Sequence, residues 1–257
     1  MNGTFTPMPG AAPLPKQVLA QTRMETRLLL RNGEQLLLAI VIPLIVLVGG
    51  ILAADRIHLH LSGSAVDTLT PGVLALAVMS TSFTSLAIAT GFERRYGVLK
   101  RLGASPLPRS GLLAGKIGAL LFVEVLQAVV VCAVAVGLGW SPTLTPASLL
   151  GALLTAALGT AAFASLGLLI AGSLRAEATL AAANLVYLLL MAGGAVVIPS
   201  TSYGGFGQVL EYLPSGALGS GLRQSLLGQG FPGWHLVVLA VWAVAGTLLT
   251  SRTFKWE

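Results

Sequence analysis

Few residues in this sequence of 257 amino acids have the types and spacing that chemistry requires. His58 and His60 form a His-x-His pair, which a β-strand would place on one face. No cysteine, further histidine or carboxylate cluster completes a metal site with them, so a polar loop is the better interpretation. Cys132 is the single cysteine and cannot form an intrachain disulfide. Because no nucleophile with a base and no carboxylate pair is visible either, the sequence predicts neither a catalytic nor a metal site.

The sequence also lacks a nucleotide-binding motif. The phosphate-binding loop of ATPases reads Gly-x-x-x-x-Gly-Lys-Ser/Thr, and its backbone N–H groups hold the phosphates. Gly115-Lys116-Ile117 is the nearest match, but it lacks both the hydroxyl residue and the upstream glycine, and it leads into an apolar run. We therefore expect no enzymatic activity and no cofactor in this chain. If ATP drives its work, a partner must bind the ATP and Mg²⁺.

Three residues with a carboxylate or amide side chain lie inside the apolar runs: Glu124, Gln127 and Asn184. Glu124 lies eight residues beyond Lys116, which is about 12 Å along a helix. A carboxylate at that depth in a bilayer costs roughly 2.5–3.5 kcal/mol unless it finds a partner or water. Asn184 lies at a similar depth from the same side, so we hypothesise that it meets Glu124 directly or through water. A polar lining or a proton site in a transport path is the alternative function of Glu124.

The composition identifies the class of protein. Hydrophobic residues make up 55% of the chain and charged residues only 9%, and the mean hydropathy is +0.86. Soluble domains carry about 25% charged residues, so this is a membrane protein with several spans. The formal charge is +6. Because the positive residues gather in alternate loops, they indicate orientation in the membrane and not nucleic-acid binding.

Six apolar stretches are long enough to cross a bilayer as helices. They cover about 36–54, 69–92, 116–139, 148–172, 178–198 and 233–250. With this order of spans, all of the 15 lysines and arginines except Arg56 and Arg223 lie on one side. The positive-inside rule then places both termini in the cytosol. The predicted fold class is an all-α polytopic membrane protein with six transmembrane helices forming one domain, 36–250.

The segments outside the spans have their own patterns. Residues 1–15 are rich in proline and glycine and predict a disordered cytosolic tail, and 251–257 form a cytosolic C-terminus. Residues 16–34 predict an amphipathic helix on the inner leaflet, although Glu25 falls on its otherwise apolar side. A solvated helix is the alternative. The basic stripe of this helix consists of Lys16, Arg23, Arg27 and Arg31.

Two further patterns concern the membrane region. A hydroxyl-rich patch in the second span either packs helices together or lines a substrate path; it consists of Ser80, Thr81, Ser82, Thr84 and Ser85. Before the last span, Phe206–Leu213 and Ser215–Leu227 predict two short helices broken at Pro214. Neither is long enough to span, so an extracellular hairpin, re-entrant or on the surface, is expected.

The most basic segment, residues 91–116, joins the second and third spans. Glu93 to Ala104 contains no proline and predicts a short helix, which Pro106 and Pro108 end. A rigid helix held just outside the bilayer is suited to docking another protein. The order of its residues is Glu93, Arg94, Arg95, Gly97, Leu99, Leu102, Pro106, Leu107, Pro108, Gly115 and Lys116.

This pattern resembles the ABC-2 permease family, the membrane subunits of ABC exporters. The N-terminal helix, the six spans and the motif from Leu213-Pro214 to Leu222-Arg223 are similar to that family too. The resemblance implies that the basic segment contains a coupling helix, which receives the push of separate P-loop ATPase subunits. Its implied contact residues are Glu93, Arg94, Arg95, Gly97, Leu99, Lys100, Arg101 and Leu102.

The resemblance implies a permease subunit in a bacterial cytoplasmic membrane. Two copies, or this chain with a related permease, would form the pathway for an amphipathic or lipophilic substrate such as a drug, lipid or glycan. The partners would be ATPase subunits, which bind ATP and Mg²⁺, and the lipid bilayer, with no nucleic acid. Three alternatives stay open: a proton-coupled secondary carrier using Glu124, an intramembrane enzyme, and a membrane scaffold without transport.

Overall fold

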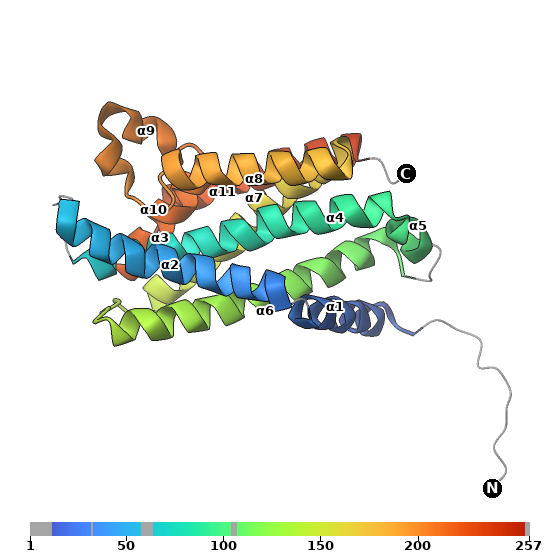
Figure 1. Cartoon of the computed structure of the whole chain (residues 1–257), viewed down its shortest axis with the longest axis horizontal. Coiled ribbons are helices and arrows are strands. Elements are labelled where there is room, and N and C mark those ends of the chain that lie inside the picture. The colour runs from blue at the N-terminus through green and yellow to red at the C-terminus, as the bar shows by residue number, and fades with distance from the viewer. Residues whose placement is uncertain (1–11, 32, 58–63, 104–106, 255–257) are drawn as a thin grey trace, which may run out of the picture.

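The computed structural model describes residues 12–31, 33–57, 64–103 and 107–254. Every regular element in these ranges is helical, which confirms the prediction of an all-α fold (Figure 1). The predictions for the N-terminal tail up to residue 11, the His58 and His60 pair, Pro106 and residues 255–257 lie outside the described ranges. The elements are α1 (Leu14–Arg31), α2 (Gly33–Ile57), α3 (Ala65–Met79), the π-helical turn η1 (Ser80–Ser85), α4 (Leu86–Arg95), α5 (Val98–Gly103), α6 (Arg109–Gly137), α7 (Pro146–Ser173), α8 (Ala176–Gly193), the 3-10 helix η2 (Ser200–Phe206), α9 (Gly207–Leu210), α10 (Pro214–Leu226) and α11 (Gly233–Thr253).

Five helices among the described residues are long and apolar enough to cross a membrane. They are Ala65–Arg95, Ser110–Gly137, Pro146–Ser173, Ala176–Gly193 and Gly233–Thr253. They lie alongside one another, which is the arrangement of a transmembrane bundle (Figure 1). The predicted first span, 36–54, falls in α2, where the apolar stretch among the described residues is Ala39–Ala54. Five spans are therefore supported by length and composition, and the sixth stays a prediction.

The longest of these helices contains the hydroxyl-rich patch as a π-helical turn. Helices α3 and α4 join through η1 into one continuous helix of 31 residues, Ala65–Arg95. The buried Thr81 donates a hydrogen bond of 2.9 Å to Gln127 of α6. The backbone of α7 comes close because Gly167 has no side chain; a Cβ there would lie 2.8 Å from the carbonyl oxygen of Phe83. These contacts favour helix packing as the role of the patch.

The fifth predicted span is shorter in the structure than in the prediction, because α8 ends at Gly193 and not at residue 198. Ala195 has a positive φ of 54°, a conformation that ends a helix. The carbonyl groups freed by this break face Arg223 of α10, which donates hydrogen bonds to Val196 O at 2.6 Å and to Val197 O at 2.5 Å. Hydropathy did not reveal the break because these residues are as apolar as the helix before them.

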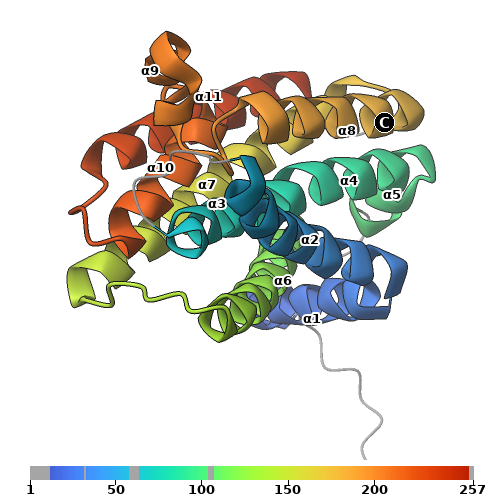
Figure 2. The ribbon, with the colours of Figure 1, turned by 60° about the vertical axis from the view of Figure 1, so that its left-hand side comes forward.

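The hairpin before the last helix has one buried and one exposed part. Helix α10 is buried along most of its length and packs against α3, α7 and α11, whereas the predicted extracellular, re-entrant or surface placement of the hairpin stays a prediction. Elements η2 and α9 project beyond the other helices at one end of the bundle (Figures 1 and 2). Their side chains Phe206 and Val209 are exposed.

Candidate functional site

The basic segment between α4 and α6 does not form the single helix predicted for Glu93 to Ala104. Helix α4 continues to Arg95, a turn follows, and α5 begins at Val98. The reason is Gly97, whose φ of +66° is a left-handed conformation that glycine adopts without a steric penalty. The prediction of one unbroken helix is therefore wrong. The segment is a tight turn followed by a helix of 6 residues.

One face of this turn and helix is anchored and the other is exposed. Leu99 is buried, while Tyr96, Lys100 and Arg101 are exposed. The Arg101 guanidinium donates a hydrogen bond of 3.0 Å to the carbonyl oxygen of Tyr96, which closes the turn. Leu102 is half-buried. The turn therefore presents an aromatic side chain and two cations at the end of the bundle where Figure 1 shows α5.

Arg94 and Arg95 face the connection between α7 and α8 and not the exposed side of α5. Arg94 donates to Gly172 O at 2.6 Å and to Leu174 O at 2.5 Å, so its guanidinium satisfies carbonyl groups left free at the end of α7. Arg95 forms an exposed ion pair with Glu177, the kind of pair that stabilises little by itself. A cavity of about 400 Å³ with several charged residues in its lining lies between these elements. Its lining consists of Gly91, Arg94, Arg95, Arg175, Ala176 and Glu177.

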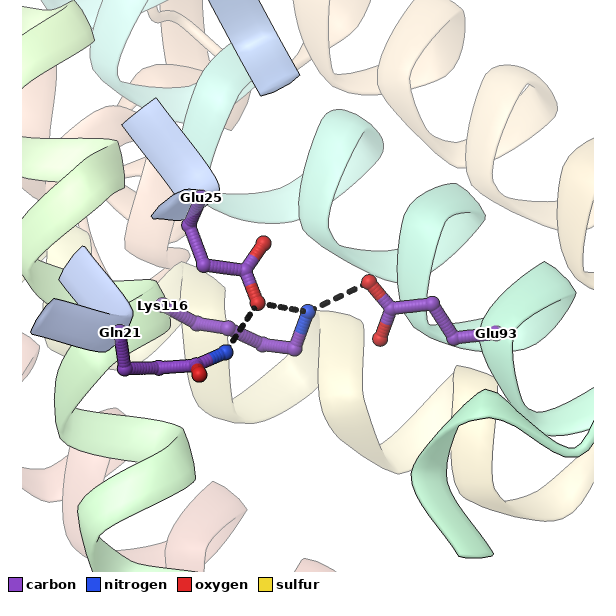
Figure 3. Close-up of polar contacts among 4 residues, drawn as sticks. All are labelled: Gln21, Glu25, Glu93 and Lys116. Atoms are coloured by element: carbon purple, nitrogen blue, oxygen red, sulfur yellow. Dashed lines mark hydrogen bonds and ion pairs between the residues drawn. The ribbon is translucent and has the colours of Figure 1, made fainter. Parts of the chain in front are cut away.

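Behind the turn, one buried lysine joins three helices (Figure 3). The ammonium of Lys116, on α6, lies 2.5 Å from a carboxylate oxygen of Glu93 on α4 and 3.1 Å from one of Glu25 on α1. Gln21, one turn before Glu25, donates a hydrogen bond of 2.8 Å to the same Glu25 oxygen. Lys116 is only 6% exposed. We call these four residues the Lys116 cluster.

The Lys116 cluster explains where Glu93 points. Its carboxylate turns inward to Lys116, and its second oxygen is buried without a hydrogen-bond partner among the described residues. One ammonium serves two carboxylates, so the cluster carries a formal excess of one negative charge. Buried charges of this kind depend on their pairing.

A glycine strip on α6 lets α1 approach closely enough to complete the cluster. A Cβ at Gly115 would lie 2.4 Å from Gln21 Cγ, and one at Gly118 would lie 2.8 Å from Thr22 Oγ1. The side of α1 that carries Glu25 therefore packs on α6, and the acid that interrupts the apolar side of the amphipathic helix is paired there with a lysine. The basic stripe of α1, with Arg23 and Arg27, stays exposed.

The structure contradicts the hypothesis that Glu124 meets Asn184. Glu124 accepts a hydrogen bond of 2.7 Å from the hydroxyl of Thr160 on α7. Asn184 is exposed on α8, and α8 and α6 lie on opposite sides of the bundle (Figures 1 and 2). Equal depth along two helices does not make their side chains neighbours, because depth leaves the facing direction open. Gln127 is 1% exposed; besides accepting the Thr81 hydrogen bond it donates one of 2.8 Å to Ala39 O.

Sequence reasoning missed three partners in these sites: Glu25, Lys116 and Thr160. The position of Glu25 on the apolar side of α1 was a usable signal, because an acid there needs a buried cation. The motif identifies Lys116 as the residue that begins the third span, but it does not indicate that Lys116 pairs with two carboxylates. Thr160 had no signal at all, since hydroxyl residues are common in membrane helices. The described residues contain no group of three potential metal-binding side chains.

Comparison with known proteins places this arrangement in a family. Residues 52–252 match the family model described as ABC-2 family transporter protein. The match includes the basic segment, residues 91–116, with Lys116, and also Glu124 and the buried α10, and it leaves α1 outside. A comparison with curated proteins gave no match. Because the family model covers most of the chain, the protein belongs to the ABC-2 family of transporter proteins.

Proposed function

We propose that this chain is the permease subunit of an ABC exporter and that α5 with its preceding turn docks an ATPase subunit. ABC-2 membrane domains work together with ATPase subunits. The observation that carries the proposal is the geometry of the α4–α5 turn: Leu99 fixes it to the bundle while Tyr96, Lys100 and Arg101 face outward. An exposed aromatic side chain beside cations is a common composition of protein interfaces.

The contacts behind the turn connect the docking segment to the transmembrane helices, so a docked ATPase can displace them. Arg94 and Arg95 tie the end of α4 to the α7–α8 connection, and Glu93 ties it through Lys116 to α6 and α1. A displacement of α5 therefore acts on four helices together. Glu93, Arg94 and Arg95 transmit the displacement in this proposal, whereas Lys100 and Arg101 meet the partner directly.

The remaining parts of the proposal extend the family assignment. The ATPase subunits bind ATP and Mg²⁺, and two permease chains, identical or related, enclose a pathway for an amphipathic or lipophilic substrate such as a drug, lipid or glycan. The protein spans a bacterial cytoplasmic membrane six times with both termini in the cytosol. The gathering of Arg94, Arg95, Lys100 and Arg101 at one end supports this orientation.

The test is purification of the tagged full chain from native membranes in mild detergent. We expect a P-loop ATPase to copurify in stoichiometric amount and to be lost with Arg101→Glu. Arg252→Glu is the matched control, because Arg252 is also exposed but belongs to α11, a different helix from the turn and α5. Copurification that survives Arg101→Glu, or loss that is equal for both reversals, would contradict docking at α5. A folded protein without any ATPase partner would contradict the proposed function itself.

A further inference from the structure

A second site lies away from the coupling segment, in a groove between α3, α6, α7 and α10. The groove has a volume of about 370 Å³, which is within the range of small-molecule sites. Its walls are apolar, with Leu74, Ala128, Ala156 and Leu222 among them, and Trp140 lies at its end in the α6–α7 connection. Among the described residues that line it, Glu124 is the one charged residue.

Only one of the two carboxylate oxygens of Glu124 has a hydrogen-bond partner among the described residues. Its side chain is 8% exposed, and one carboxylate oxygen, Oε2, accepts the hydrogen bond of Thr160. The other oxygen, Oε1, is buried and has no hydrogen-bond partner among the described residues. A carboxylate can accept several hydrogen bonds, and a buried one without a counter-charge is costly. A positively charged donor at Oε1 would satisfy this oxygen and favour the ionised carboxylate.

We propose that this groove binds an amphiphile carrying a protonated amine. The amine donates to Oε1 of Glu124 and neutralises its charge, while the apolar body of the ligand lies along Ala128 and Ala156 toward Trp140. One group then supplies both the charge and the hydrogen bond, which an alcohol or an anion does not. The charge of Glu124 and the apolar walls together select this class of ligand.

The surroundings of the groove allow entry from the membrane. Val136 of α6 and Leu149 and Leu153 of α7 line the groove, and all three are exposed. From Glu124 to the end of α6 at Gly137 the helix rises about 20 Å, so the groove extends from mid-helix to the α6–α7 connection. A ligand already dissolved in the bilayer would reach Glu124 by moving along this path.

Binding is measured on the purified full chain in nanodiscs of neutral phosphatidylcholine. The probe is dodecylamine with a fluorophore at the far end of its chain. The same probe with its amine acetylated is the neutral control, and the alkyl sulfate of equal length is the anionic control. We expect only the amine to bind tightly, and Glu124→Gln to weaken its binding about tenfold or more, because a charge-assisted hydrogen bond is lost.

A pair of neighbouring alanines separates filling of the groove from general damage. Ala156 lines the groove, whereas Ala157 is exposed outside it. We expect Ala156→Leu to weaken binding of the amine and Ala157→Leu to leave it unchanged, which keeps the test decisive even if Glu124→Gln does not fold. Equal binding of amine and acetylated probe, or full binding by Glu124→Gln or Ala156→Leu, would overturn the inference. The inference would also fail if a second copy of the chain fills the groove. In that case the unmodified chain would not bind the amine, and Ala156→Leu would form fewer dimers than the unmodified chain.

The inference rests on the proposed function only in the step from binding to transport. If the ATPase copurifies and the amine does not bind, the groove assignment fails and the permease assignment stands. If the amine binds and no ATPase copurifies, the groove assignment stands and the permease assignment fails. Neither result depends on the other, because binding is measured on this chain alone.

Discussion

At the scale of single residues, the Lys116 cluster gathers three charged side chains in the interior at the basic end of the bundle. Its three charged members come from α1, α4 and α6, and Lys116 alone neutralises two acids. A buried ion pair contributes little compared with an apolar replacement of both partners, but removal of one partner leaves an uncompensated charge. The stability of the arrangement is therefore most sensitive at the shared lysine.

We predict that Lys116→Met destabilises the folded protein by about 3–5 kcal/mol, because Glu25 and Glu93 lose their counter-charge. The measurement is thermal unfolding of the purified chain in detergent, where a decrease of the midpoint is expected. Lys100→Met is the control, because Lys100 is exposed and should leave the midpoint unchanged. Adding Glu25→Gln and Glu93→Gln to Lys116→Met should restore part of the loss. An unchanged midpoint for Lys116→Met would show that the cluster does not hold these helices.

At the scale of elements, the proposed docking of α5 depends on one backbone conformation. The left-handed φ of Gly97 turns the chain between α4 and α5 and so directs Tyr96 and Arg101 outward. A Cβ at Gly97 would meet no neighbouring atom within 4 Å, so a substitution there acts through φ and not through crowding. This makes the position a clean test of the turn.

We predict that Gly97→Val abolishes copurification of the ATPase while the transmembrane helices stay folded. A β-branched residue tolerates left-handed φ poorly, so the turn should open and α5 should lose its orientation. Gly97→Asn is the matched control, because asparagine adopts this conformation far more readily. Circular dichroism should show equal helix content in both variants. If Gly97→Val retains the ATPase as well as Gly97→Asn does, the conformation of the turn is not what docking requires.

The helices themselves were largely predictable from the sequence, because long apolar runs and basic loops carry a strong signal. The absence of proline does not reveal the break at Gly97, because a glycine in a left-handed conformation also interrupts a helix. The early end of α8 was missed for a related reason: Gly193 and Gly194 lie inside a run that remains apolar. The partner of Glu124 could not be predicted, because sequence gives the depth of a residue and not the direction it faces.

At the scale of the whole molecule, the number of membrane spans depends on α2. The helix is 25 residues long, contains Pro43 and precedes the region of five clear candidate spans. If α2 also spans, residues 12 and 96 lie on one side of the membrane and residue 64 on the other. If it does not, residues 12 and 64 share a side. The orientation of the basic stripe on α1 toward the inner leaflet follows from the first arrangement only.

We predict that Ala12→Cys and Tyr96→Cys react with a membrane-impermeant maleimide only after the cells are permeabilised, whereas Ser64→Cys reacts in intact cells. Each variant is made in a Cys132→Ser background, because Cys132 is the one native cysteine. The background protein without an added cysteine is the control for unspecific labelling. Labelling of Ala12→Cys from outside intact cells would reduce the count to five spans and would place α1 on the outer surface.

The π-helical turn η1 sets the rotation of α4, the helix that carries Glu93 and Arg94, relative to α3. Each residue of an α-helix advances it by 1.5 Å and rotates it by about 100°. A π-helical turn contains about one residue more than an α-helical turn. The added residue in η1 therefore rotates α4 by about 100° relative to a regular continuation of α3. In the observed phase Glu93 faces Lys116 and Arg94 faces the end of α7. A regular helix through Ser80–Ser85 would turn both side chains away from these partners, so the alignment at the basic end is set by the winding of a turn in the middle of the bundle.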